Sequence, residues 1–314
     1  MLNPYKITAI FCLIDDLFIG INHQEDSRRS VSDSEIAVTA IVSALYFGGN
    51  QFHAIHFMRT HGHIPKMLDK SRFNRRLHQI GRLLYDLFAQ VGCYLKEVRC
   101  ELHYIIDSFP VAVCDNIRIM NCKLVKGKKW RGYTASMRRY FYGVKVQLLT
   151  TGSGIPVAFC FTPGNQADVK SLEKIVSGLP PEASVYADSA YTDYNIEDNL
   201  FNNELVLLKV QRKSNSKRPD NKQQAKQKLK MRKRVETTIS DIKKMFPRTI
   251  HAVTLNGFLV KLILFVFALQ INKLTNYQLE LITYTISSSP PGGFWHVLLP
   301  YHYFQWVVFV QTIQ

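Results

Sequence analysis

The order of secondary-structure signals after residue 100 constrains the fold of this chain more than any other feature. Three β-rich runs come first, HYIIDSFPVAV, RYFYGVKVQLLTT and IPVAFCFTPG, and the glycines and proline of residues 152–156 predict a hairpin between the last two. A helical segment (DVKSLEKIVSGL), a strand (SVYADS), a helix (NIEDNLFNNE), a strand (LVLLKVQ) and a long helix (KQKLKMRKRVETTISDIKKMF) follow. An α/β domain with a mixed sheet flanked by helices accounts for this order.

The first hundred residues show helical signals instead. Ser32 and Glu35 form the pattern of a capping box in front of an apolar run, which predicts the start of a helix. A second, short helix is predicted over QFHAIHFMRT, and a third, continuous one over SRFNRRLHQIGRLLYDLFAQV. The third helix has one apolar face, made of Phe73, Leu77, Ile80, Leu84, Leu87 and Val91.

Basic side chains cover the remaining surface of that third helix. They are Arg72, Arg75, Arg76 and Arg82. A helix with this pattern suits presentation to DNA, as in helix-turn-helix modules. The alternative is a solvated basic face on an ordinary bundle helix. We therefore predict a helical DNA-binding region that precedes the α/β domain.

The charge of the whole chain agrees with a polyanionic partner. Lys and Arg number 40 against 24 Asp and Glu, which gives a net charge of +16. Such a balance favours nucleic acid and, less often, an anionic membrane. Two stretches are especially basic: residues 118–145, which include Lys128 and Lys129 and contain no acid, and residues 209–234, with Asp220 as the sole acid. They are predicted to contact DNA phosphates, although a single run of this kind is more often a solvated loop.

Several features argue against a secreted or membrane protein. The six cysteines form no CxxC pair or regular framework, which is typical of reduced thiols in a cytoplasmic protein. The N-terminus lacks the basic start of a signal peptide and carries Asp15 and Asp16 within its apolar run. The most apolar stretch, Leu259 to Ile271, contains Lys261 and is too short to span a bilayer, so we predict a buried core helix and no membrane partner.

Three acidic residues stand out by their position. Asp107 and Asp188 each end a short β run, and Glu236 lies on the last predicted helix. Mg²⁺ prefers oxygen ligands, and two such ions can clamp the attacking and leaving oxygens in phosphoryl transfer. The pattern predicts that these carboxylates converge on metal. Asp168 and Asp193 lie nearby in sequence and are predicted to be helix caps or turn residues instead.

The helix that carries Glu236 also places two cations on roughly the same face. Arg232 precedes it by four residues and Lys243 follows it by seven, so both are candidate phosphate contacts. The alternative is an ordinary amphipathic helix with surface ion pairs.

The segments VSDSE, SRFNRRL, IDSFPVAVCDNIR, RYFYGVKVQLLTT, PGNQADV, ADSAYTDY and RKRVETTISDIK resemble DDE-type bacterial insertion-sequence transposases. They are most similar to the insertion-sequence 982 family, over residues 31–274. The resemblance implies an RNase H-like domain whose acidic triad falls on Asp107, Asp188 and Glu236. It also matches the spacing of Arg232, Glu236 and Lys243 in a signature of related transposases, but Leu229 stands where that signature begins with Tyr.

The same resemblance implies two Mg²⁺ ions, with Mn²⁺ as a substitute, and cutting and joining of double-stranded DNA at the terminal repeats of a mobile element. A homo-oligomer is expected, because two DNA ends must be brought together. We predict three segments: a helical DNA-binding region (1–100), the catalytic domain (101–276) and a tail (277–314) that lacks charged residues from Leu281 onward. Two other functions remain open: a DNA-binding protein without catalysis and a structure-selective nuclease.

Overall fold

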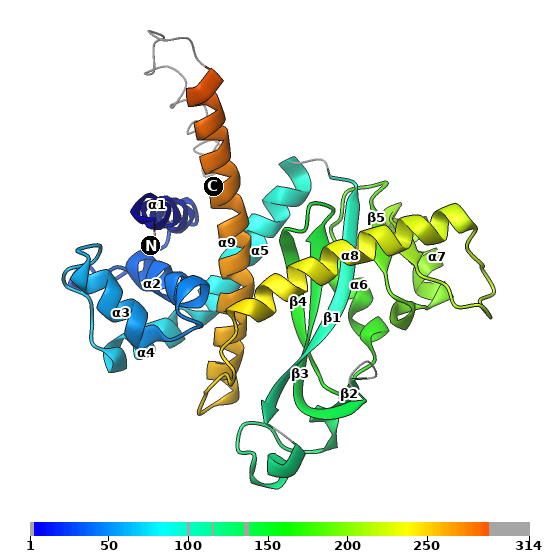
Figure 1. Ribbon diagram of the computed structural model, residues 1–314, viewed down its shortest axis with the longest axis horizontal. Helices are drawn as coiled ribbons and strands as arrows, with labels where there is room; N and C mark the ends of the chain where they lie inside the picture. Colours follow the sequence, from blue (N-terminus) through cyan, green and yellow to red (C-terminus); the bar gives the residue numbers. More distant parts are fainter. Residues whose placement is uncertain (1–2, 99–100, 115, 135–137, 289–314) are drawn as a thin grey trace. The chain divides into compact units, whose positions relative to one another are not determined.

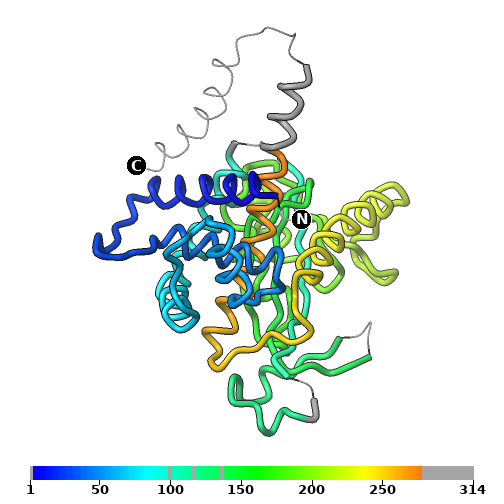
Figure 2. The backbone as a smooth tube through the Cα atoms, turned by 60° about the vertical axis from the view of Figure 1, so that its left-hand side comes forward, coloured from blue at the N-terminus to red at the C-terminus, as the bar shows by residue number. Residues whose placement is uncertain are grey.

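The computed structural model describes residues 3–98, 101–114, 116–134 and 138–288 (Figure 1). Two compact units are present, one made of residues 88–262 and the other of residues 1–87 together with the chain from 263 onward. Figure 2 follows the backbone through both units. This division runs through helices α5 (Gly81–Val98) and α9 (Leu255–Ser288), so it does not coincide with the three predicted segments, which stay predictions.

A mixed sheet forms the centre of the unit 88–262. Its strands are β1 (His103–Cys114), β2 (Arg131–Thr134), β3 (Arg139–Thr151), β4 (Pro156–Pro163), β5 (Ser184–Ala187) and β6 (Leu207–Val210). Their order is β2-β3-β1-β5-β6, and β4 pairs with β3. β1, β3 and β4 are antiparallel, whereas β1, β5 and β6 are parallel. The predicted strands and the β3–β4 hairpin are confirmed; β2 is a short strand that the sequence pattern did not predict.

Helical segments connect these strands. They are α6 (Leu172–Val176), α7 (Tyr194–Glu204), α8 (Lys222–Met245) and the 3₁₀ turns η1 (Asn116–Asn121), η2 (Lys128–Trp130), η3 (Asp168–Ser171) and η4 (Ser189–Tyr191). The helices predicted after residue 167 are confirmed, and α8 crosses the sheet in Figure 1. Successive residues of a strand point to opposite faces of the sheet. The strand residues that a helix contacts therefore show on which face of the sheet that helix lies.

One face of the sheet packs against α5 and α8. Phe159 of β4 meets Phe88 of α5 with ring centroids 4.7 Å apart, and Phe109 of β1 lies 6.5 Å from Phe246, which directly follows α8. On the opposite face, the Gln147 side chain of β3 donates a hydrogen bond to Asp168 of η3 and accepts one from Tyr191 of η4. The sheet therefore lies between two helical layers.

The other unit is helical. Its elements are α1 (Pro4–Gly20), α2 (Asp33–Tyr46), α3 (Gln51–Thr60), α4 (Lys70–Gln79) and the adjoining parts of α5 and α9. The capping box of Ser32 and Glu35 is confirmed. The single third helix was wrong: the chain turns at Ile80, between α4 and α5, and Gly81, a weak helix former, follows. All six residues of its predicted apolar face are nevertheless buried.

A buried ion cluster holds α4 against α2. The Asp33 carboxylate, with 3% of its side chain exposed, accepts hydrogen bonds from Arg76 at 2.5 Å, from Arg29 at 2.9 Å and pairs with His23 at 2.9 Å. Burial raises the pKa of Asp33, but the bonds from Arg76 and His23 outweigh it and hold the pKa below its ordinary value. Arg76 therefore has a structural partner that the pattern did not predict, and only 13% of its side chain remains exposed.

The three other arginines of the predicted DNA-binding face are exposed: Arg72, Arg75 and Arg82. Arg72 lies 3.3 Å from Asp69, and Arg82 lies 3.9 Å from Asp86. Exposed pairs of this kind contribute little stability, so these side chains can exchange partners readily. Their contact with DNA stays a prediction.

Helix α9 is longer than the predicted core helix. Within the described residues, its segment Leu255–Tyr277 is the one stretch long and apolar enough to cross a membrane by length and composition, which corrects the prediction that it is too short. The core helix of a soluble protein passes the same test, and 67% of the most apolar window is buried inside the protein. Of the predicted tail, residues 277–288 continue α9 and residues 289–314 lie outside the described part.

Gly92 of α5 tests how closely this helix packs on the sheet. A Cβ atom at Gly92 would lie 2.0 Å from the carbonyl oxygen of Val157 in β4. Helix propensity alone predicts that Gly92→Ala stabilises the protein by about 0.5–1 kcal/mol. We expect the opposite, a loss on the order of 3 kcal/mol, because α5 must move away from β4. Urea unfolding of wild type and Gly92→Ala measures whether the free energy of unfolding rises or falls.

Gly178→Ala is the control for this experiment. Gly178 has a φ of +70°, and a Cβ added there would have no atom within 4 Å. The stability that Gly178→Ala loses therefore reflects backbone strain alone, about 1 kcal/mol. An equal or smaller loss at Gly92 would contradict the close packing of α5.

Candidate active site

The register of the parallel strands brings two of the predicted carboxylates together. β1 and β5 pair from His103 opposite Ser184 to Ile106 opposite Ala187, and Asp107 and Asp188 are the next residue of each strand. The prediction that Asp107 ends its strand was wrong, because β1 continues along β3 as far as Cys114. Asp107 nevertheless lies at the end of the parallel pairing, which is why Asp188 is its neighbour.

The third carboxylate comes from α8. This helix begins with a capping box between Asn221 and Gln224, and its buried face packs on the sheet. Thr238 donates a hydrogen bond to the carbonyl of Gly154 at 3.0 Å and fixes α8 on the β3–β4 hairpin. Glu236, with 52% of its side chain exposed, lies on the side of α8 that Arg232 shares.

The Arg232 guanidinium joins the carboxylates. Its Nη1 lies 3.6 Å from Asp188 Oδ1, and its Nε lies 3.1 Å from Glu236 Oε1. The Nε group is buried and is not oriented for a hydrogen bond, so the second contact is electrostatic. Nη1 also donates to Gln211 Oε1 at 3.3 Å. Arg232 lowers the pKa of Asp107 as well, so one cation acts on all three acids.

Asp107 is the most perturbed acid of the site. Burial raises its pKa from the ordinary value of 3.8 to about 6, and the negative charges of Asp188 and Glu236 add to this rise. The Ser108 N–H, which donates to the Asp107 carboxylate at 2.7 Å, and the charge of Arg232 act in the opposite direction. The folded protein therefore pays a free-energy cost to ionise Asp107 at neutral pH.

Lys243 lies near Asp107, two turns along α8 from Glu236. Its Nζ is 5.4 Å from the centroid of the Phe109 ring. Partial burial lowers the pKa of Lys243, and the charge of Asp107 partly offsets this effect. The exposed ammonium group can still reach a phosphate, and that role stays a prediction.

The residues fit a divalent cation by charge and donor type, although the present side-chain positions do not form a finished metal site. No group of three or more His, Cys, Asp or Glu side chains in the described ranges is close enough to hold a metal. Arg232 nevertheless lies close to Asp188 and Glu236, and its charge also lowers the pKa of Asp107, so one cation offsets the negative charge of these carboxylates. Oxygen ligands are those that Mg²⁺ prefers. The Arg232 side chain would have to withdraw for a metal ion to take its place.

Asp168 takes part in a polar network on the opposite face of the sheet. Its Oδ1 accepts from Lys145 Nζ at 2.7 Å and from Gln147 Nε2 at 2.6 Å. Tyr191, just after Asp188, donates to Gln147 Oε1 at 2.5 Å, and burial raises the pKa of Tyr191. Asp168 is the first residue of η3 and hence a turn residue, one of the two predicted roles; it is not the cap, which is Ala167, and its carboxylate is an ion-pair partner of Lys145. This network fixes the strands behind the carboxylates.

Asp193 is the N-cap of α7, as predicted. Gln211, in contrast, was missed by the sequence reasoning. It follows β6 as Asp188 follows β5, and its N–H donates to the carbonyl of Ala187 at 2.9 Å. Gln211 occupies the same place after a parallel strand as Asp188, but the sequence prediction was limited to acidic residues.

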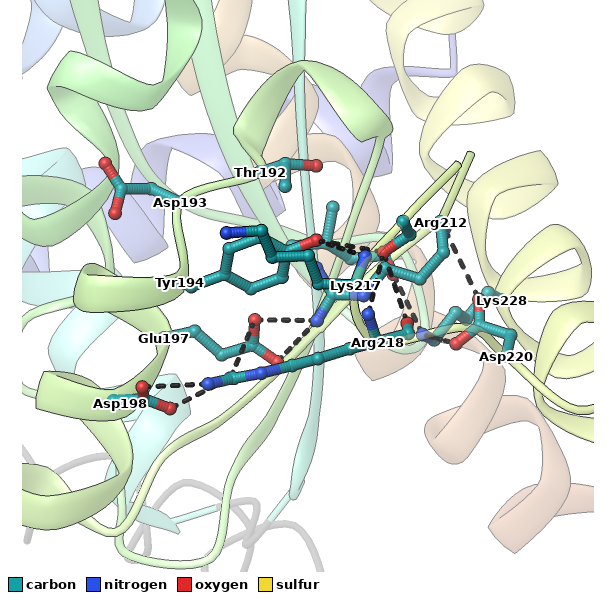
Figure 3. A network of polar contacts seen from close by, with 12 residues as sticks. Thr192, Asp193, Tyr194, Glu197, Asp198, Arg212, Lys217, Arg218, Asp220 and Lys228 are labelled. Carbon is teal, nitrogen blue, oxygen red and sulfur yellow. Dashed lines mark hydrogen bonds and ion pairs between the residues drawn. The ribbon is translucent and has the colours of Figure 1, made fainter. Parts of the chain in front are cut away.

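Part of the basic run 209–234 is paired with acids within the fold (Figure 3). Arg212 pairs with Glu197 at 2.5 Å, and Arg218 pairs with Asp198 at 2.9 Å, on α7. Lys228 pairs with Asp220 at 2.5 Å. These contacts fasten the β6–α8 connection, so the run offers less free charge to DNA than its composition suggests. Lys128 and Lys129, in the other basic run, are exposed.

The raised pKa of Asp107 has a measurable effect on stability. Because the folded-state pKa lies above the unfolded value, the protein loses stability as pH rises from about 4 to about 6, and the loss is complete at higher pH. Asp107→Asn should therefore stabilise the metal-free protein by about 3 kcal/mol at pH 7.5 and change it little near pH 4.

Chemical unfolding in EDTA at both pH values checks this expectation. Asp193→Asn is the matched control, because Asn caps a helix as well as Asp does. A destabilised Asp107→Asn protein at pH 7.5 would show that ionised Asp107 is favourable in the folded state.

Comparison with known proteins places this site in a family. Residues 97–252, about half of the chain, match the profile of the family described as Transposase DDE domain. The matched segment contains all six described strands, α8 and the three carboxylates. No curated protein and no solved structure gave a match. The chain therefore carries a transposase DDE domain over residues 97–252.

Proposed function

We propose that this protein is a transposase that cuts the ends of its own insertion sequence and joins them to target DNA by two-metal phosphoryl transfer. The observation that carries the proposal is that Arg232 lies close to both Asp188 and Glu236, while Asp107 and Asp188 are neighbours at the end of the parallel strand pairing. The order of three antiparallel strands followed by two parallel ones supports an RNase H-like fold for the domain. Assignment to the insertion-sequence 982 family rests on the segment resemblance.

Each residue of the site has a separate task in this proposal. Asp107, Asp188 and Glu236 hold the divalent ions, Mg²⁺ or in its place Mn²⁺. Two such ions would activate the attacking oxygen and stabilise the leaving oxygen of an in-line displacement. Arg232, released from the carboxylates, and Lys243 bind phosphate oxygens of the DNA strand. Asp107 must lose its proton to act as a ligand, and a pKa of about 6 allows this at neutral pH.

Double-stranded DNA is the proposed partner, both as element ends and as target. The net charge of +16 supports it, and exposed Arg72, Arg75, Arg82, Lys128 and Lys129 are the proposed phosphate contacts. Joining two ends requires two sites held together, so a homo-oligomer is proposed for the complex with DNA. Action on DNA in the cytoplasm, at the nucleoid, follows from the same proposal.

Asp188→Asn tests the catalytic assignment. The protein is incubated with a labelled duplex that carries the DNA flanking its own coding sequence, with Mg²⁺ or with EDTA. We expect metal-dependent cutting at a defined boundary and at least a hundredfold loss in the variant, because a neutral amide holds metal poorly. Binding of the same duplex in EDTA should change little.

Asp193→Asn is the control, since it changes a carboxylate five residues away that caps α7. Cutting of every duplex without a boundary would favour the structure-selective nuclease. Binding without cutting under any metal condition would favour the DNA-binding protein without catalysis.

Arg232→Gln tests the metal site without a cleavage assay. If a metal ion must displace the Arg232 guanidinium, removing that charge should raise the affinity for Mn²⁺ by about tenfold, the factor given by 1.4 kcal/mol of lost competition. Titration calorimetry measures the Mn²⁺ affinity of each protein. Asp188→Asn, which removes a proposed ligand, should bind Mn²⁺ more weakly than wild type. Equal Mn²⁺ affinity in Arg232→Gln and wild type would show that Arg232 and metal occupy different places.

A further inference from the structure

The hairpin of β2 and β3 has one face that the proposed catalytic site does not use. Its cross-strand pairs are Arg131 with Tyr142, Gly132 with Phe141, Tyr133 with Tyr140 and Thr134 with Arg139. Residues two apart on a strand share a face. One face therefore carries Arg131, Tyr133, Tyr140 and Tyr142, and the other carries Gly132 and Phe141.

The second of these faces is closed by the loop after β4. Gly132 is buried, and a Cβ there would lie 2.3 Å from the carbonyl oxygen of Gly164. Gly164 in turn donates its N–H to the carbonyl of Gly143 at 3.1 Å. The hairpin is thus fixed from one side by backbone contacts, which leaves its other side as a firm surface.

The first face is open and aromatic. Tyr133 is 52% exposed and Tyr140 is 45% exposed, with their ring centroids 4.9 Å apart. The Arg131 guanidinium lies over the Tyr140 ring at 4.3 Å from its centroid. We call Arg131, Tyr133 and Tyr140 the stacking face. Two neighbouring exposed rings with a cation on them are the kind of surface on which flat, anionic ligands stack.

A cleft of about 770 Å³ adjoins the stacking face: it shares Arg131 with it and is also lined by Tyr142, the cross-strand neighbour of Arg131. Apolar side chains and cations line it together, among them Ile119, Met120, Val125, Lys126 and Lys128. Tyr142 is buried, and its hydroxyl donates to the carbonyl of Gly127 at 3.2 Å, which fixes the loop that carries the two lysines. The cleft therefore offers apolar contact and positive charge side by side.

The positive charge of this region favours an anionic ligand. No acidic residue occurs in the sequence between Asp115 and Asp168, whereas residues 118–145 contain nine Lys and Arg. Inside a duplex the flat faces of the bases are covered by their neighbours, so a duplex offers phosphates but no ring faces. Unpaired nucleotides offer both, and both are matched by the stacking face and the cleft.

We propose that the stacking face and the adjoining cleft bind unpaired nucleotides of a DNA strand. Bases stack on Tyr133 and Tyr140, while phosphates contact Arg131, Lys126 and Lys128. This inference rests on the proposed function, because it takes DNA as the substrate, and it adds that part of this DNA is single-stranded.

The sheet connects this surface to the carboxylates. Asp107 of β1 lies opposite Leu148 of β3, and Tyr142 lies six residues away along the same strand. Six strand residues span roughly 20 Å, a distance that a strand of a few nucleotides covers. An unpaired end held on the stacking face can thus belong to the same DNA molecule that enters the site at Asp107.

The experiment compares two fluorescent DNA molecules in EDTA, which prevents cleavage. One is a blunt duplex, and the other is the same duplex with a tail of about five unpaired thymidines at one end; 3′ and 5′ tails are tested separately. We expect at least one tail to raise the affinity about tenfold, as one or two stacked bases contribute about 1–3 kcal/mol each. The variant Tyr133→Ala/Tyr140→Ala should lose this advantage and keep its affinity for the blunt duplex.

Two further variants separate stacking from a folding defect. Tyr133→Phe/Tyr140→Phe keeps both rings and should keep the preference for the tail. Phe201→Ala removes an aromatic ring that is 51% exposed on α7, outside the hairpin, and should change neither affinity. A 2-aminopurine base in the tail reports stacking directly, since its fluorescence should fall on binding to wild type and not on binding to the double alanine variant.

Three outcomes would overturn the inference: no tail preference in wild type, equal losses on blunt and tailed DNA in the double alanine variant, or a tail of ribonucleotides bound more tightly than one of deoxyribonucleotides. The test is independent of catalysis. Tail preference without any metal-dependent cutting would refute the proposed cleavage and leave this inference standing. Cutting without tail preference would refute this inference alone.

Discussion

The parallel pairing of β1 with β5 is the contact on which the site depends. Because the pairing ends at Ile106 and Ala187, the next residue of each strand is an aspartate, and two like charges become neighbours. Burial then makes ionisation of Asp107 costly. Such an arrangement is stable only if a cation balances it, and Arg232 of α8 does so in the metal-free protein. Helix α8 thus carries both the third carboxylate, Glu236, and the cation that offsets the carboxylates in the metal-free protein, Arg232.

Both helical layers hold this pairing in place. On one face, Thr238 fixes α8 to the β3–β4 hairpin through the carbonyl of Gly154. On the other, Tyr191 reaches from the turn after Asp188 to Gln147 of β3. The sheet beside the aspartates is therefore held from both sides, by α8 and by the turn that follows Asp188.

The element order could be predicted because it depends on local sequence, in which alternation marks a strand and a helical period marks a helix; the nearness of Asp107 and Asp188 could be predicted because each directly follows a short apolar β run, and the role of the three carboxylates as metal ligands stays a prediction. The failures concern information that is not local. The partner of Arg76 is Asp33, 43 residues away, and sequence spacing cannot reveal it. The extension of β1 beyond Asp107 depends on β3, which pairs with it. Gln211 was overlooked because its role comes from its neighbour Ala187 on β5.

Charge counting does not show which cations of the two basic runs are already paired within the fold, and the reason is physical. The run 209–234 has acids available on α7 and in its own loop, so Arg212, Arg218 and Lys228 are paired within the fold. The run 118–145 has no acid in it; Lys145 pairs with Asp168 of η3, whereas Arg131, Lys128 and Lys129 are exposed, and Arg131 lies over the ring of Tyr140. A cation contributes to DNA binding only to the extent that the fold leaves it unpaired. The surface around Arg131 is therefore a candidate for holding the DNA strand, because its exposed cations lie beside exposed tyrosine rings, while α8 supplies Glu236 to the catalytic site.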